Sequence, residues 1–461
     1  MGTVGINFGS PTAGTGFDVT STVSQIVSNL RNIETPWKSQ LTSLQSQDTA
    51  ISSLGTLLST LSTDVSQFTD FQGVLAGKQG SSSDPDVLAL TSASSAAIAG
   101  THTIVVNSLA ATSSGYLDAI TNASDMLSGS LSIQVGSGAA QTITLDSTDN
   151  TLSGLAAAIN TAGIGVTASV LTDTNGARLS LVSGTSGTAG DLTVSSSIAD
   201  STTSTALAYH TATTGLNASL TVDGVGISSA SNTVSTVIPG VTFQLLAPSP
   251  VTGGSAEQIQ VQILNDNSSV VSAVSQFVTD YNAVIMAVNA QEANTSSGTP
   301  EPLFGTPTLT LLQEQLVDSI NSVNSQGDIT SFTQLGLSVN NDGTLTLDSD
   351  ALNSELNNDY SGVVSFFQNS GSWGMNFSTA LNNLGTSSST GSLALALKSD
   401  SATETSLNTD ISNEELLITA QQASLTAELN TANQILQSIP SNLNDVAELY
   451  SAITGYQAPK F

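Results

Sequence analysis

Apolar residues recur with a helical period at the N-terminal end of the chain. Between residues 17 and 68 they return every three or four positions, which is the spacing of an amphipathic helix. Asp18 or Thr20 can cap the start and Pro36 interrupts the pattern, so we predict a short helix, a break and a long helix. A seven-residue series within it predicts a coiled-coil seam that includes Trp37, Leu44, Ile51 and Leu58.

The C-terminal end carries the clearest periodicity. Pro440 follows a possible capping residue, Ser438, so we expect a kink or a helix restart there. A stripe about forty residues long makes a rod of roughly 60 Å that cannot bury its apolar face alone, so we expect it to pair with the N-terminal helices. One heptad series is Ile411, Ile418, Leu425, Ala432, Ile439, Val446 and Ile453, and the other is Leu429, Leu436, Leu443 and Tyr450.

The middle of the chain changes to a period of two. Between about residues 80 and 265, alternating runs such as 131–135 and 258–263 predict β-strands. Asn175-Gly176 predicts a hairpin turn, and only residues 152–160 have a helical pattern. This region is expected to form a β-rich head.

Helical patterns return after the head. They cover residues 268–288 and 309–323. A short hairpin follows over 335–348, with Asp342-Gly343 at its turn, and a further helix is expected over 351–356.

Composition narrows the possible partners. The chain has 36 acidic and 6 basic residues and a net charge of −30, so we expect neither nucleic acid nor an anionic membrane surface as a partner. Only 9% of residues are charged, so neutral polar groups must form most of the surface. Such groups are less costly to desolvate than charges, which favours packing against other protein subunits. An extracellular or salt-adapted protein is the alternative interpretation.

The sequence offers little for catalysis or cofactor binding. It has no cysteine and two histidines, His102 and His210, which we expect on strand surfaces. Asn340 to Gly343 superficially resembles a calcium loop, but a hairpin turn fits better. We therefore expect no catalytic, cofactor or metal site, no Sec signal peptide and no membrane-spanning helix.

Four stretches of this chain resemble the flagellar filament-capping family, hook-associated protein 2. Residues 17–23 resemble the start of the first family helix, and residues 277–282 the start of its C-terminal region. The pattern over 335–348, followed by 363–367, is similar to the family's most distinctive segment. Residues 151–182 resemble a small repeat that flagellins and their caps share.

The resemblance implies a non-enzymatic cap at the distal end of the flagellar filament, extracellular and exported through the flagellar type III machinery with an export chaperone. It further implies a ring of about four to six copies, with five expected, contacts with flagellin and the hook–filament junction protein, and adhesion in some members. The alternatives are another flagellar axial protein, either flagellin or a junction protein, and a secreted adhesin.

We predict an α+β multidomain fold with terminal helices in a coiled-coil leg, a helical trunk, and an inserted β-rich head of two small domains. The expected segments are 1–75, 76–116, 117–205, 206–264, 265–410 and 411–461. They are, in order, the N-terminal leg and trunk, the first part of the head, the inserted flagellin-like domain, the second part of the head, the trunk with its hairpin, and the C-terminal leg. The residues predicted to mediate self-assembly or filament contact are Trp37, Leu44, Ile51, Leu58, Leu425, Leu429, Leu436, Ile439, Leu443, Val446 and Tyr450.

Overall fold

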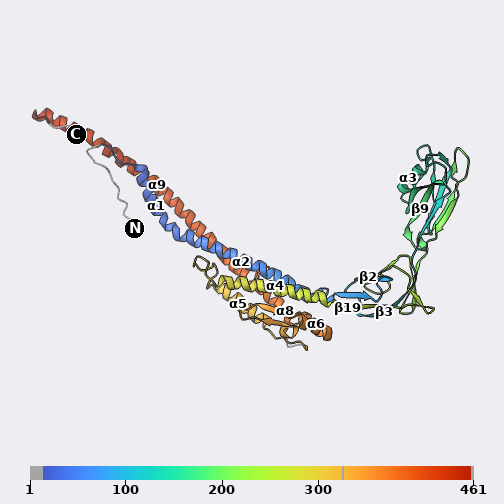
Figure 1. The fold of residues 1–461 in the computed structure, drawn as a ribbon. Coiled ribbons are helices and arrows are strands. Elements are labelled where there is room, and N and C mark those ends of the chain that lie inside the picture. Colours follow the sequence, from blue (N-terminus) through green and yellow to red (C-terminus); the bar gives the residue numbers. More distant parts are fainter. Residues whose placement is uncertain (1–13, 324–326, 458–461) are drawn as a thin grey trace. The chain divides into compact units, whose positions relative to one another are not determined.

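The computed structural model describes residues 14–323 and 327–457, which fold as an α+β protein (Figure 1). The chain divides into a helical unit, built from the residues up to Thr69 and from Ala273 onward, and a β unit, Asp70–Ser272. The two ends of the chain pack together through long helices, and the β unit is inserted between them in the sequence. The predicted fold class is therefore confirmed.

The N-terminal helix is broken where the chain changes direction, as predicted. The break lies just before Pro36, which falls in the first turn of the second helix, where its missing N–H breaks no helical hydrogen bond. The elements are α1 (Val19–Leu30), the 3-10 turn η1 (Arg31–Ile33) and α2 (Glu34–Thr69).

One long helix, α9 (Ser392–Thr454), forms the C-terminal end and packs along α1 and α2. It passes through Pro440 without interruption, so of the two predicted alternatives the helix restart is wrong, and the kink stays a prediction. A proline inside a helix removes one backbone hydrogen bond, and the helical turns on either side persist here. The helix also begins at Ser392, well before Ile411. The heptad pattern does not extend over residues 392–410, so this part of the helix could not be predicted from the sequence.

The remaining helices form the trunk of the helical unit. Asn282 of α4 stands in for a strand partner, because its side chain accepts from the Leu345 N–H at 2.6 Å and donates to the Leu345 carbonyl at 2.9 Å. The predicted hairpin and the helices around it are present. The elements are α4 (Asn267–Gln291), α5 (Pro307–Ile320), η4 (Phe332–Leu335), β20 (Leu337–Val339), β21 (Leu345–Leu347), α6 (Ser349–Asn358), α7 (Tyr360–Gln368) and α8 (Trp373–Leu384).

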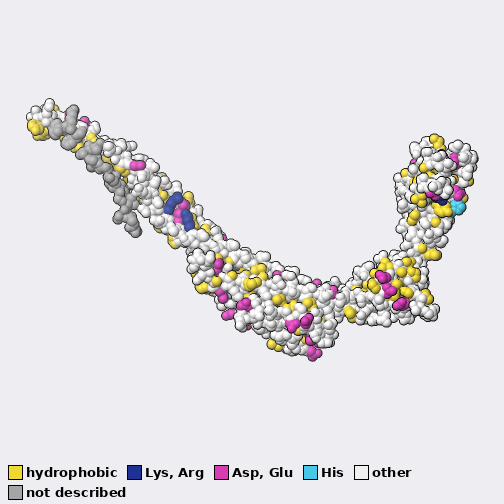
Figure 2. All heavy atoms as spheres, in the orientation of Figure 1, with side chains coloured by type: hydrophobic (Ala, Val, Ile, Leu, Met, Phe, Trp, Pro, Cys, Tyr) yellow, Lys and Arg dark blue, Asp and Glu magenta, His cyan; other side chains and the backbone are white. Residues whose placement is uncertain are grey.

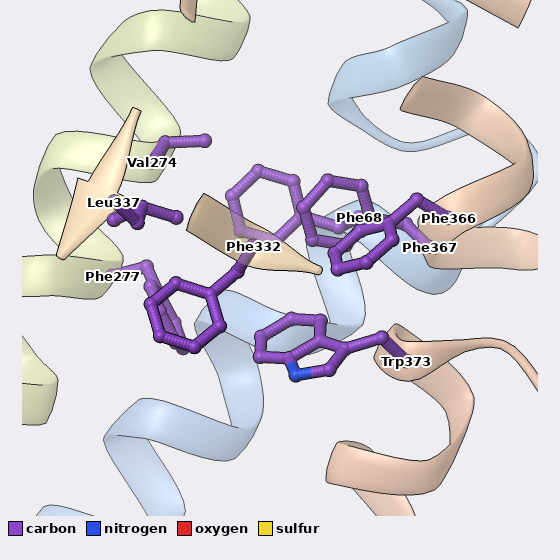
Figure 3. A pocket seen from close by; sticks show the side chains of 8 residues that line it. All are labelled: Phe68, Val274, Phe277, Phe332, Leu337, Phe366, Phe367 and Trp373. Atoms are coloured by element: carbon purple, nitrogen blue, oxygen red, sulfur yellow. The ribbon is translucent and has the colours of Figure 1, made fainter. Parts of the chain in front are cut away.

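An aromatic cluster fills the centre of the trunk (Figure 3). Trp373 stacks on Phe366 and Phe377, with ring centroids 5.3 and 5.0 Å apart, and Phe277 meets it edge-on at 6.1 Å. The Trp373 indole N–H donates to the Ile320 carbonyl at 3.2 Å, so its polar group is satisfied. Only a cavity of about 10 Å³ remains between these rings, which leaves no room for a ligand.

The β unit has two hydrophobic clusters. The first belongs to residues 87–110 and 218–263, and the second to residues 117–207. The division of the chain into six segments stays a prediction. The first cluster is built on a five-stranded antiparallel sheet, in the order β1 (Lys78–Ser82), β19 (Ile259–Asn265), β3 (Gly100–Ser108), β13 (Ala218–Val222) and β14 (Val225–Ser229), and a three-stranded one, β15 (Thr233–Val234), β16 (Val241–Leu245) and β2 (Leu88–Ala93).

The second cluster lies between a helix and two further sheets. The hairpin predicted from Asn175-Gly176 is present in the larger one, but its two turn residues are Thr174 and Asn175, since Gly176 already pairs with Asp173. That sheet has the order β12 (Tyr209–Thr213), β4 (Thr112–Leu117), β9 (Gly176–Ser186) and β8 (Val166–Asp173); the smaller has β10 (Leu192–Ser196), β6 (Ser130–Val135) and β7 (Gln141–Thr144); and the helix is α3 (Leu152–Ala162).

Short elements complete the β unit. They are η2 (Val74–Ala76), η3 (Thr188–Gly190), and the two-stranded pairs β5 (Leu127–Ser128) with β11 (Ala199–Asp200) and β17 (Val251–Thr252) with β18 (Ser255–Ala256).

We predict that Tyr281→Phe stabilises the helical unit. Tyr281 is completely buried in the trunk, and its hydroxyl has no hydrogen-bond partner among the described residues. Burial also raises the pKa of Tyr281 to about 12. Because an unsatisfied buried hydroxyl costs about 1–3 kcal/mol, the variant should gain about 1 kcal/mol in urea unfolding followed by circular dichroism at 222 nm. A loss of stability would mean that the hydroxyl has a partner.

We also predict that Asp64→Asn raises stability at pH 7 and flattens its pH dependence. Burial, a hydrogen bond with the Asp280 carboxyl group and the charge of that group raise the pKa of Asp64 to about 6. Between its ordinary pKa of 3.8 and about 6 the folded state binds more protons than the unfolded state, so unfolding free energy falls as pH rises through this range.

Urea unfolding between pH 3.5 and 8 measures this effect. Asp318→Asn is the matched control, because Asp318 is exposed on α5. An Asp64→Asn profile that has the same slope as the parent protein and the control would contradict the prediction.

Candidate assembly surface

The helix α1 presents one apolar face. Asp18 caps its start, accepting from the Ser21 N–H at 3.0 Å, as one of the two predicted capping residues. Val19, Val23 and Val27 follow at intervals of four and are all buried. This spacing places the three valines in one row along the helix.

That row packs against α9. Ile418 is 1% exposed among the three valines, and the surrounding partly buried residues are Phe17, Leu30, Leu425 and Leu429. The helices run antiparallel, since the Phe17 N–H donates to Asn433 Oδ1 at 2.9 Å while Arg31, fourteen residues later, meets Glu415 at 2.7 Å. Gly16 precedes this contact with φ of +63°, and a side chain there would collide with Asn433, so the position requires glycine.

Four charged residues meet where α1 gives way to α2, and we call them the Glu415 cluster: Arg31, Glu34, Lys38 and Glu415. Arg31 Nη2 lies 2.7 Å from Glu415 Oε2, and Lys38 Nζ lies 2.6 Å from Glu34 Oε2 and 3.8 Å from Glu415 Oε1. The Glu34 side chain is only 1% exposed. Figure 2 shows Lys and Arg atoms beside Asp and Glu atoms on this part of the helical unit.

The predicted seam residues differ widely in burial. Ile51 and Leu58 are 2% and 1% exposed and belong to the core of the helical unit. Val446 and Tyr450 are 64% and 52% exposed, so no described residue buries them. The others lie half-buried along α2 and α9: Trp37, Leu44, Leu425, Leu429, Leu436, Ile439 and Leu443. Their role in assembly stays a prediction.

The last three turns of α9 carry an exposed apolar stripe, which we call the α9 stripe: Val446, Leu449, Tyr450 and Ile453. These side chains are between 52% and 75% exposed. Their spacing of three and four residues places them on one side of the helix. A contiguous exposed apolar stripe on a helix is typical of a surface that packs against another chain.

The histidines lie on strands, as predicted. His102 of β3 has Nδ1 2.7 Å from Asp223 Oδ2, and His210 of β12 has Nε2 2.8 Å from Asp118 Oδ1. The hydrogen bond with His102 holds the pKa of Asp223 below its usual value, and the Ala208 N–H does the same for Asp118. These pairs fix neighbouring strands.

Among residues 14–323 and 327–457, no group of three or more His, Asp or Glu side chains is placed to hold a metal ion. No helix in those ranges is long and apolar enough to cross a membrane.

The polar contacts of α1 could not be predicted from the sequence. Glu34, Glu415 and Asn433 follow no sequence motif or spacing that would mark them. One signal was present, since two of only six basic residues, Arg31 and Lys38, stand seven positions apart on the same helical stretch.

The comparisons with known proteins point to one family. The family model of the flagellar hook-associated protein 2 N-terminus matches residues 15–114, and that of its C-terminus matches residues 215–448. The B-type flagellar hook-associated protein 2 of Pseudomonas aeruginosa is 32% identical over 320 residues, 64% of this chain and 66% of that protein. Flagellar hook-associated protein 2 of Escherichia coli K12 is 30% identical over 58% of this chain and 61% of its own length.

A solved structure agrees with the sequence comparisons. The chain is similar to the D1-D2-D3 domains of the flagellar cap protein FliD from Escherichia coli, with a TM-score of 0.58 and 25% identity, covering 76% of this chain and 99% of that one. In the two sequence comparisons, the matched region spans slightly less than two thirds of the length of each relative. With a C-terminal family match over half of its length, this chain belongs to the flagellar hook-associated protein 2 family.

Proposed function

We propose that this chain is a structural, non-enzymatic cap at the distal end of the bacterial flagellar filament, where it promotes the folding and polymerisation of exported flagellin. The observation that carries the proposal is the match to flagellar hook-associated protein 2 at both ends of the chain, together with the fold likeness to a flagellar cap protein. The cap works outside the cell, at the filament tip.

In this role the chain acts by binding and positioning other subunits, without catalysis. The α9 stripe and the half-buried seam of α2 and α9 supply apolar surface that one intrachain partner does not cover. In the proposed arrangement these helices pack among the helices at the open end of the filament, and the β unit lies over the space where flagellin folds.

Several partners follow from the proposed role. The chain forms a ring of about five copies through heterologous contacts, and it meets flagellin and the hook–filament junction protein. The flagellar type III machinery and an export chaperone carry it out of the cell. Neither a flagellin-type axial role nor a purely adhesive one has a specific observation in its favour.

Deletion of the gene in its native host tests the proposal. We expect cells without filaments and unpolymerised flagellin in the medium, because exported subunits would not be retained at the tip. Electron microscopy of the cells and immunoblotting of the medium measure this, and expression from a plasmid should restore filaments. Normal filaments with unchanged flagellin secretion would refute the cap role.

The α9 stripe is expected to be necessary for capping. Replacing Val446, Leu449, Tyr450 and Ile453 with alanine removes exposed apolar area and keeps helix propensity, so the isolated protein should fold normally. In the deletion strain this variant should secrete flagellin as monomer.

The control replaces polar side chains on the turns just before the stripe: Ser441→Ala, Asn442→Ala and Asp445→Ala, all exposed. It should support normal filaments. Equal filament growth by the stripe variant and the control would show that the stripe is dispensable.

A further inference from the structure

The helix α1 is joined to the rest of the helical unit by few contacts. It has twelve residues, and helices of about this length are marginal in water without tertiary packing. Only three of its side chains are buried, and Ile418 is the one fully buried partner on α9. In contrast, α2 buries a long series of residues between Ile51 and Phe68.

The break at η1 separates the two helices mechanically. Because residues 31–33 form a 3-10 turn, α1 can leave α9 without breaking the α-helical hydrogen bonds of α2. Local opening of this kind follows local stability, which is lowest where few apolar contacts are buried.

Polar contacts hold α1 at both ends. At its start the Phe17 N–H donates to Asn433, and at its end the Glu415 cluster joins η1 and α2 to α9. Glu415 is the shared element of the cluster, since its two carboxylate oxygens face Arg31 and Lys38 separately. Arg31 and Lys38 are about half exposed, so dissolved salt can screen these ion pairs.

One carboxylate of the cluster, that of Glu34, is buried. The Glu34 carboxylate is 1% exposed, and its Oε1 has no hydrogen-bond partner among the described residues. A carboxylate in this position depends on Lys38 for compensation, and the same ammonium group faces Glu415. Loss of Glu415 therefore removes the link from both cations to α9.

We propose that α1 is a detachable helix and that the Glu415 cluster is the clasp that holds it on α9. Detachment exposes two matching apolar rows, Val19, Val23 and Val27 on α1 and Ile418, Leu425 and Leu429 on α9. Both rows then become available for pairing with helices of other subunits. The clasp is a property of the isolated chain and does not depend on the proposed capping role.

Hydrogen–deuterium exchange of the full-length protein, followed by mass spectrometry, tests the clasp. In Glu415→Gln we expect amides of residues 19–30 to exchange about fivefold faster, because an ion-pair network of this exposure is lost. Amides of residues 51–68 should keep their rates. Raising sodium chloride from 0.05 to 1 M should speed exchange of residues 19–30 in the parent protein, and much less in Glu415→Gln.

Two further variants sharpen the result. Glu414→Gln changes the neighbouring carboxylate, which forms no ion pair in the cluster, and should behave as the parent protein. Arg31→Gln should also speed exchange in α1, and the double variant Arg31→Gln/Glu415→Gln should fall short of the product of the two single effects, because both remove the same ion pair.

Two results would overturn the proposal. One is unchanged exchange of residues 19–30 in Glu415→Gln at both salt concentrations, which would show that the valine row alone holds α1. The other is equal acceleration of residues 19–30 and 51–68, which would show that the cluster supports the whole helical unit rather than α1.

Discussion

The pairing of α2 with α9 is the interaction on which the helical unit depends. Each helix carries a long apolar stripe that it cannot bury by itself. Each therefore packs against the other and against the trunk helices, which removes the stripe from water. Because these partners come from opposite ends of the sequence, both the β unit and the trunk helices α4 to α8 lie between them along the chain. The aromatic cluster around Trp373 then fixes α7 and α8 against α2 and α4.

On the outer faces of these helices, many polar side chains form hydrogen bonds within their own helix. Threonine hydroxyls such as those of Thr42, Thr49 and Thr56 on α2, and Thr405 and Thr426 on α9, donate to the carbonyl four residues earlier. Such bonds satisfy the polar group within the helix, so covering the surface with another subunit strips away less hydration than covering charges would. The low cost of desolvating these hydroxyls favours packing against other subunits. On such a surface the few cations stand out, and two of them, Arg31 and Lys38, form ion pairs with Glu415.

Much of the fold could be predicted from the sequence because its signals were long or local. The heptads predicted the terminal helices, and Asn175-Gly176 and Asp342-Gly343 predicted their hairpins, since each glycine has a positive φ in or directly after the turn, +118° at Gly176 and +82° at Gly343. The continuity of α9 through Pro440 could not be predicted, because local preference disfavours it and only the surrounding turns sustain it. The helix α8 was missed as well, since Trp373 and Phe377 are buried by tertiary contacts that a short window cannot show.

The candidate assembly surface was predictable only in its apolar part. Periodicity identifies Leu425, Val446 and Tyr450 as one stripe, yet it cannot tell that the first is half-buried beside α1 while the other two are exposed, because burial depends on which part of α9 lies beside α1. The polar contacts of Glu415 and Asn433 join residues about four hundred positions apart and follow no spacing rule. They nevertheless decide how firmly α1 is held, because its apolar contact is small. Packing thus gives the trunk its rigidity, whereas a few exposed polar contacts hold α1 against α9.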